Sequence, residues 1–172
     1  MRTESEHHTP GQVLAHRVRE ARKRRDWTQQ QLADRLRELG FPTHRLTIAK
    51  IEKGGTRAEN APLREVLALA AALDVAPVHL LVPLEDEAMV AVTPELFSQA
   101  RHVRAWIRGR NILRGGDLAQ YLAEMPDSEQ LALLDPRDNI SQALGGPLPV
   151  DDNFREMRDA LLSALSKEES NG

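Results

Sequence analysis

The sequence predicts an all-α protein, with a five-helix N-terminal domain followed by a C-terminal helical domain. Apolar residues recur at spacings of three and four along much of the chain, which is typical of one face of a helix. Apolar residues make up 41 % of the chain but aromatic residues only 3 %. A core must therefore be built from Leu, Val, Ile and Ala, which suits helices better than a β-sandwich.

Four segments are expected along the 172 residues. They are a disordered arm (1–11), a compact domain (12–82), a linker (83–92) and a helical domain for dimerisation or partner binding (93–172). The chain has no cysteine, which excludes disulfides and thiolate metal sites. No apolar run is long enough for a membrane span and no signal peptide is recognisable. We therefore expect a cytoplasmic protein that does not bind membranes.

The charges are segregated along the chain. The net charge is −3, which by itself argues against a partner as acidic as nucleic acid. Residues 1–57, however, hold 13 Lys and Arg against 7 Asp and Glu, whereas residues 115–172 hold 4 against 12. The N-terminal part is therefore suited to meet phosphates and the C-terminal part is not.

Five helices are expected within residues 12–82. The first carries Leu14, Val18 and Ala21 on one face. The second opens after Thr28, a good N-cap, and stops at Gly40. The third opens at Thr43 or His44 and ends at Gly54-Gly55, and a polar loop (56–61) follows. The fourth runs from Pro62 to Leu73, and a short fifth helix follows Pro77.

The C-terminal half shows weaker helical patterns. Thr93-Pro94-Glu95 is a helix-start signal, and Leu96, Ala100, Val103 and Ile107 mark a helix to about Arg110. The arginines of this helix are expected to pair with the acidic C-terminal part rather than to contact DNA. Further helical patterns cover 117–125, 127–134 and 152–166, with a loop at 135–150. The last of them has an apolar face wide enough to need a partner surface.

Two stretches carry a resemblance to a known family. They are Thr28-Gln29-Gln30-Gln31-Leu32-Ala33 and Thr47-Ile48-Ala49-Lys50-Ile51-Glu52-Lys53-Gly54. Together, in this order, they resemble the XRE family of helix-turn-helix regulators, the Cro and phage-repressor type. The resemblance covers residues 13–82 and implies a lambda-repressor-like fold. It also implies a homodimer that binds double-stranded operator DNA with its third helix in the major groove, and a repressor without a cofactor.

Helical periodicity separates two faces of the third helix. Ile48, Ile51 and Glu52 fall on the inward face, and Leu46, Ala49, Lys50 and Lys53 on the outward face. An outward Leu and Ala can touch thymine methyls, and Lys can reach guanine. The expected base contacts are therefore Leu46, Ala49 and Lys50. The resemblance adds His44, Arg45 and Thr47, because the start of the third helix points toward base edges in that family. The expected phosphate contacts are Thr28, Gln29, Lys53 and Arg57.

Two further expectations come from the resemblance. It implies that the inward Glu52 pairs with Arg22 of the first helix. The link between the second and third helices is also longer here than the family's, and Arg37-Glu38-Leu39 is expected to lengthen the second helix by about one turn.

The sequence is also compatible with a function other than transcription regulation. An interaction protein such as an antitoxin, binding a protein partner through 93–172, is the main alternative. No metal-binding motif, phosphate loop or nucleophile–base arrangement is recognisable, so no enzymatic activity is expected.

Overall fold

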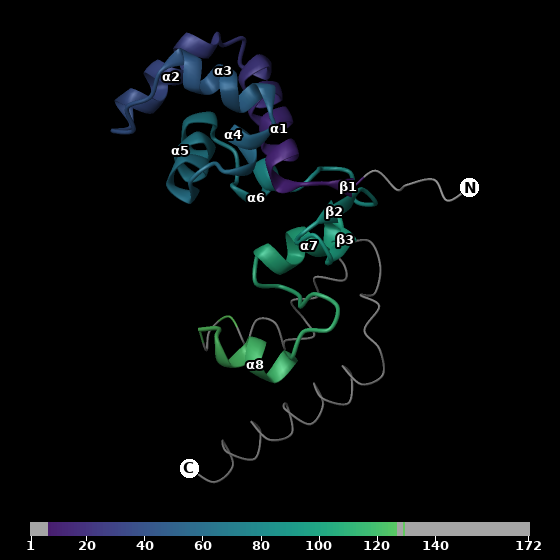
Figure 1. Ribbon diagram of the computed structural model, residues 1–172. Coiled ribbons are helices and arrows are strands. Elements are labelled where there is room, and N and C mark those ends of the chain that lie inside the picture. Colours follow the sequence, from purple (N-terminus) through teal and green to yellow (C-terminus); the bar gives the residue numbers. More distant parts are fainter. Residues whose placement is uncertain (1–6, 127–128, 130–172) are drawn as a thin grey trace, which may run out of the picture. The chain divides into compact units, whose positions relative to one another are not determined.

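The computed structural model describes residues 7–126 and Glu129 of the chain. The chain divides into two units, Met1–Gly115 and Gly116–Gly172. The first unit contains every element from β1 to α7, and α8 (Leu118–Ala123) belongs to the second (Figure 1). The predicted patterns at 135–150 and 152–166, and nearly all of 127–134, lie outside the described residues.

Six helices come first in the chain after β1. α1 (Pro10–Arg24), α2 (Gln29–Glu38) and α3 (Arg45–Lys53) are followed by α4 (Thr56–Glu59), α5 (Leu63–Leu73) and α6 (Val78–Leu81). Five of these six were expected. α4 was missed because a single turn in a polar stretch has no periodicity, although its Ala58 is buried.

The ends of α2 and α3 agree with the sequence signals. Thr28 caps α2, since its hydroxyl accepts from the Gln31 N–H and the Gln31 side chain returns to the Thr28 N–H. Gly40, at φ +77°, follows the C-cap Leu39. α2 therefore includes Arg37 and Glu38 of the segment expected to lengthen it, and Leu39 is its C-cap. His44 precedes α3, and Gly54 ends it at φ +83°.

One core holds these helices together. Its innermost side chains come from α1, α2, α3, α5 and α6 and are almost completely inaccessible to solvent. They are Leu14, Val18, Leu32, Leu36, Ile48, Ile51, Leu69, Leu73 and Leu80. Ile48 and Ile51 fix the rotation of α3, because burying them turns the opposite face outward.

The expectation of an all-α protein is wrong. Three short strands, β1 (His7–His8), β2 (Met89–Ala91) and β3 (Phe97–Gln99), form a sheet in the order β1-β2-β3. β1 runs parallel to β2 with His7 opposite Met89, and β2 runs antiparallel to β3 with Val90 opposite Ser98. The segment 83–92, expected as a linker, therefore contains the central strand.

The helix expected from Thr93 begins only at Ala100. The Thr93 hydroxyl does accept from the Leu96 N–H at 3.0 Å, as a helix cap would. The chain turns at Thr93–Leu96 instead, and the next residues form β3. α7 (Ala100–Ile107) follows directly, and the Ala100 N–H donates to the Ala88 carbonyl. Pairing with the buried β2 overrides the helical spacing of residues 96–107.

A second, smaller core joins the sheet to the helices. Val78 and Val82, at the two ends of α6, pack with Val90 of β2 and with Ala100 and Val103 of α7. α6 therefore contributes Leu80 to the first core and Val78 to the second, and its C-cap residue Val82 also packs in the second. The sheet and α7 lie at the opposite end of the first unit from α2 and α3 (Figure 1).

Residues 7–11, expected as part of a disordered arm, take part in regular structure. Besides the pairing of β1, Thr9 caps α1 through a capping box with Gln12, and Pro10 occupies the first turn. The Thr9 hydroxyl also bonds to Glu59 of α4. The residues Thr9-Pro10-Gly11-Gln12 carry this capping signal in the sequence. They place the start of α1 at Pro10 rather than near residue 12.

The close approach of α1 to α4 depends on Gly11. A Cβ at this position would lie 2.6 Å from the Cα of Glu59. We expect Gly11→Ala to destabilise the domain by about 1–3 kcal/mol, because backbone must move, although alanine normally favours a helix. Urea unfolding followed by Trp27 fluorescence in a Trp106→Phe background measures this. His16→Ala, an exposed change on α1, is the control, and equal stability of the two variants would contradict the prediction.

The arginines of α7 pair within their own unit. The Arg104 side chain is buried and donates to the Pro83 carbonyl and to Asp86, and Arg101 pairs with Glu87. Within the described residues, the acid partners of these two arginines are therefore Asp86 and Glu87. In the second unit, α8 follows its expected pattern, and the Asp117 carboxylate caps it through the N–H groups of Ala119 and Gln120.

Candidate nucleic-acid interface

A buried ion pair fixes α3 to α1. The Arg22 guanidinium donates from Nε to Glu52 Oε1 at 2.6 Å and from Nη2 to Glu52 Oε2 at 2.8 Å. The side chains are 11 % and 4 % exposed. Such two-point geometry holds both position and orientation, so the end of α3 has little freedom to roll on α1.

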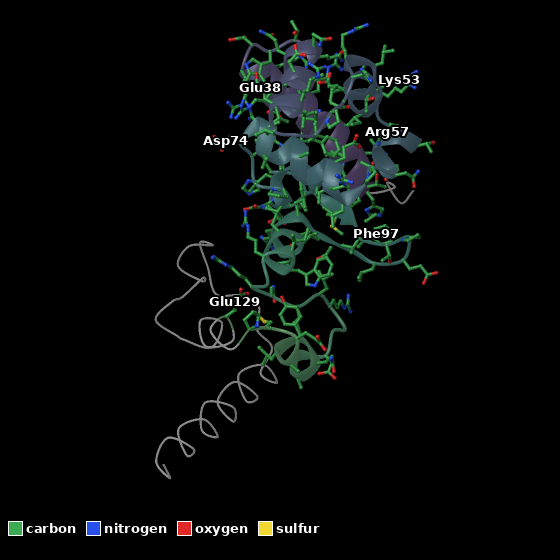
Figure 2. The ribbon with its side chains drawn as sticks, turned by 90° about the vertical axis from the view of Figure 1, so that its left-hand side faces the viewer. Glu38, Lys53, Arg57, Asp74, Phe97 and Glu129 are labelled. Carbon is green, nitrogen blue, oxygen red and sulfur yellow. The ribbon has the colours of Figure 1, made fainter. Side chains whose placement is uncertain are left out.

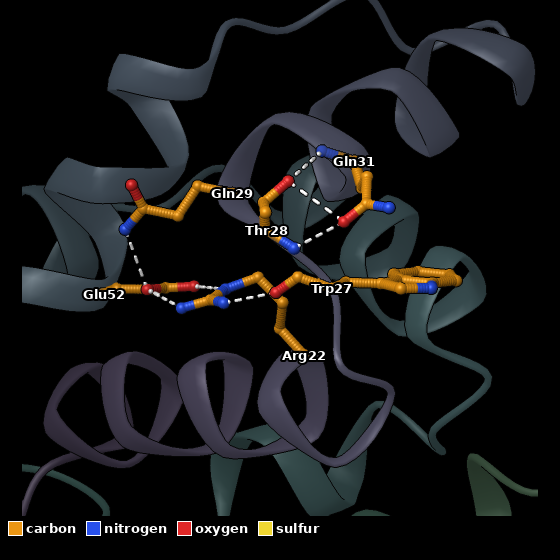
Figure 3. A network of polar contacts seen from close by, with 6 residues as sticks. All are labelled: Arg22, Trp27, Thr28, Gln29, Gln31 and Glu52. Atoms are coloured by element: carbon orange, nitrogen blue, oxygen red, sulfur yellow. Dashed lines mark hydrogen bonds and ion pairs between the residues drawn. The ribbon is translucent and has the colours of Figure 1, made fainter.

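Two further groups complete this network (Figure 3). Arg22 Nη1 donates to the Trp27 carbonyl at 2.6 Å, in the turn before α2. Gln29 Nε2 donates to Glu52 Oε2 at 3.0 Å. One carboxylate therefore connects α1, α2 and α3. This role of Gln29 was not predicted from the sequence, although the residue directly follows the capping Thr28 at the start of α2.

The network also determines the charge of Glu52. Burial alone would raise the pKa of its carboxyl, but hydrogen bonds from Arg22 and Gln29 outweigh burial and hold the pKa below its ordinary value of 4.5. The carboxylate is therefore charged at neutral pH and keeps the Arg22 side chain in place.

Within the described residues, the charged side chains on the outward face of α3 take part in no ion pair comparable to Arg22–Glu52. His44, Arg45, Leu46, Lys50 and Lys53 are exposed, and Thr47 and Ala49 are half-buried. Leu46 is 62 % exposed. In the part of the chain that the structure describes, Arg45, Lys50 and Lys53 take part in no ion pair. This face therefore combines uncompensated positive charge with an exposed leucine.

The residues expected at phosphates differ in their surroundings. Thr28 uses its hydroxyl and its N–H in the capping box, and Gln29 uses its amide nitrogen on Glu52. Lys53 and Arg57 project from the same side of the bundle (Figure 2). Lys53 forms no ion pair within residues 7–126, but Arg57 Nη2 lies 2.6 Å from both carboxylate oxygens of the buried Glu65.

This pairing predicts a structural role for Arg57. Arg57→Ala leaves the buried Glu65 carboxylate without its cation, so we expect the free energy of unfolding to fall by about 1–3 kcal/mol. Urea unfolding measures this loss. The slope of DNA affinity against salt should change less for Arg57→Ala than for Lys53→Ala, which removes an unpaired cation from the same side. An unchanged stability together with a reduced salt slope would contradict the prediction and make Arg57 a phosphate contact.

Other kinds of site lack support in the described part of the chain. Within residues 7–126 and Glu129, no group of three His, Asp or Glu side chains could hold a metal ion. None of the helices described there is long and apolar enough to cross a membrane.

Comparison with known protein families identifies the domain. Residues 13–82 match the model of a helix-turn-helix domain. Searches of curated proteins and of solved structures gave no significant match. The match ends within the α6 region, so the sheet and α7 lie beyond it. Residues 13–82 of this chain are a helix-turn-helix domain, the kind of domain that indicates DNA binding and a role in transcription regulation.

Proposed function

We propose that the protein is a sequence-specific DNA-binding regulator of the XRE, phage-repressor type, which represses transcription by occupying an operator. The observation that carries this is the outward face of α3. It presents three cations that form no ion pair with the described residues, together with an exposed leucine, and a buried network holds it in a fixed orientation. A surface that is both basic and rigid can read a groove, whereas a basic surface alone only attracts phosphate.

Base contacts are assigned to the start and the outward face of α3. Arg45 and Lys50 have the length and charge to donate to guanine O6 and N7. Leu46 and Ala49 offer apolar contact to thymine methyl groups. His44 and Thr47 lie beside them at the N-terminal end, which points toward base edges in this geometry.

Phosphate contacts are assigned to Lys53 and to the N-terminus of α2. Thr28 and Gln29 open that helix. Their side chains are occupied within the protein, so the groups offered to a phosphate are the backbone N–H groups of the first turn, supported by the helix dipole. Arg57 is left with a secondary role, since it already pairs with Glu65.

The rest of the proposal concerns assembly. Two copies would place two α3 helices in successive major-groove faces about one helical turn, roughly 34 Å, apart. The residues after the first unit carry most of the excess negative charge of the chain. They are suited to bind a second copy or a protein partner, and they are not suited to lie along DNA.

Footprinting tests the proposal on the DNA upstream of the protein's own gene. We expect the full-length protein to protect one discrete site composed of two related half-sites, with affinity that falls as salt rises. Unrelated DNA of equal length is the control. Protection without any preferred site, equal on both fragments, would rule out operator recognition and leave only electrostatic binding.

A further inference from the structure

The outward face of α5 exposes large apolar side chains. Leu63 is 72 % exposed, the highest value among the exposed large apolar residues of the described chain, and Leu67 is 48 % exposed. Ala71, one turn further on, is exposed as well. The three follow one another at intervals of four residues, so they form one stripe along the helix. Exposed apolar stripes of this kind often mark interaction surfaces.

A shallow hollow lies at the other end of the same stripe. Its volume is about 350 Å³, and Leu67 forms the side of it nearest to Leu63. The rest is lined by side chains from the end of α5 and the following turn, which are the apolar Ala70, Ala71, Val75, Ala76 and Pro77 and the charged Asp74. Leu63 and Ala71 are eight residues apart, which is about 12 Å along a helix. One face of α5 therefore carries the projecting Leu63 and, further along, a shallow depression lined mostly by small apolar side chains and by Asp74.

We propose that this face binds a second copy of the chain, with the two α5 helices antiparallel across a two-fold axis near Leu67. In this arrangement, Leu63 of each copy enters the hollow of the other. Such an interface satisfies the rule for two-fold contacts, in which residue i meets residue j and j meets i. Leu63 and Leu67 of both copies become shielded from water, and both copies use the same surface.

The charges at the two ends of the stripe fit the same arrangement. Arg64 lies beside Leu63 at the start of α5, and Asp74 follows Leu73 at its end. The Asp74 side chain is 94 % exposed, with its carboxylate 3.7 Å from Arg25. Antiparallel pairing brings the positive end of one α5 to the negative end of the other. Parallel pairing would instead place like charges together.

The surroundings of α5 argue against DNA as its partner. Residues 58–92 hold one Lys or Arg against six Asp and Glu, so this region repels phosphate. Asp74, at the end of α5, and Lys53, at the end of α3, also lie on opposite sides of the bundle (Figure 2). A second copy on α5 therefore leaves the outward face of α3 uncovered.

Sedimentation equilibrium of the full chain over a wide range of concentration tests the proposal without DNA. We expect a monomer–dimer equilibrium that Leu63→Glu weakens at least tenfold. Leu39→Glu is the matched control, because Leu39 is also an exposed leucine, at 45 %, but lies at the end of α2. Both substitutions are at exposed positions, and circular dichroism checks that both variants fold. A monomer at every concentration, or a dimer that Leu63→Glu leaves unchanged, would overturn the proposal.

Cross-linking tests the antiparallel arrangement. The chain has no cysteine, so a single introduced thiol is the only one present. Leu67→Cys, close to the proposed axis, should give a covalent dimer with a short bismaleimide, whereas Leu39→Cys should not. A dimer that is sensitive to Leu63→Glu but not cross-linked through residue 67 would overturn the antiparallel pairing of α5. Footprinting on DNA is a separate readout, so failure here leaves the proposed DNA recognition by α3 untouched.

Discussion

Replacing Glu52 with alanine should lower the free energy of unfolding of the helix-turn-helix domain by about 3–5 kcal/mol. The loss is large because the substitution leaves a buried charge without its partner. Arg22 remains buried with its charge, and two of its hydrogen bonds lose their acceptor. Gln29 loses an acceptor too. This cost is a large part of the stability of a domain of this size.

Glu38→Ala is the control for this change. Glu38 also pairs with an arginine, Arg35, at 3.0 Å, but both side chains are largely exposed. A solvated pair within one helix contributes less than about 1 kcal/mol. Urea unfolding followed by Trp27 fluorescence, in the Trp106→Phe background, compares the two variants in the same domain. Equal losses would show that the Arg22–Glu52 pair has no more effect than a surface contact.

The pH dependence supplies a second readout of the same pair. The pKa of Glu52 lies below its ordinary value of 4.5 in the folded chain. Its contribution to stability is therefore fully present above about pH 4.5, where the unfolded chain is also ionised. It is lost as the pH falls through the lower, folded value. The difference in stability between the wild type and Glu52→Gln should accordingly be constant near neutral pH and shrink in acid. A difference that grows as the pH falls would contradict the assigned direction of the shift.

Elements could be predicted from the sequence where helical periodicity and helix-capping residues marked them. α2 and α3 were placed to within a residue, because Thr28, Gly40 and Gly54 mark their ends and Ile48 and Ile51 set the inward face of α3. The sheet could not be found in the same way. β1 pairs with β2 across about 80 residues of chain, and strands of two or three residues are too short to show alternation.

The sequence predicted which side chains of the third helix point outward, but it did not predict the contacts that surround them. The outward position of Leu46 and Lys50 follows from helix geometry alone. The partners of Gln29 and Arg57 do not, because each depends on a residue brought close by folding, Glu52 and Glu65. A cation in the sequence is equally compatible with phosphate and with a buried carboxylate. Only the tertiary contacts distinguish the two.

The α3 cations should account for most of the discrimination between operator and unrelated DNA. We expect the double substitution Arg45→Ala, Lys50→Ala to weaken operator binding by about 2–4 kcal/mol, roughly 30- to 1000-fold, because a good side-chain contact to a base contributes about 1–3 kcal/mol. Both side chains are exposed and in no ion pair of the described chain. Stability should therefore change by less than about 0.5 kcal/mol. Fluorescence anisotropy with operator and scrambled duplexes at several salt concentrations measures both affinities.

The matched control removes the same charge from another surface. Arg110→Ala, Arg114→Ala changes two exposed arginines that follow α7, which lies at the far end of the unit from α3. This variant should bind the operator nearly as the wild type does, apart from a small long-range electrostatic loss that salt removes. The ratio of operator to scrambled affinity is the decisive quantity. If Arg45→Ala, Lys50→Ala lowers both affinities by the same factor, the two cations contact only phosphates and the sequence is read by other residues. If the ratio collapses while binding to the scrambled duplex is largely retained, α3 is the reading helix, since the loss of uniform charge cannot produce selectivity for one sequence.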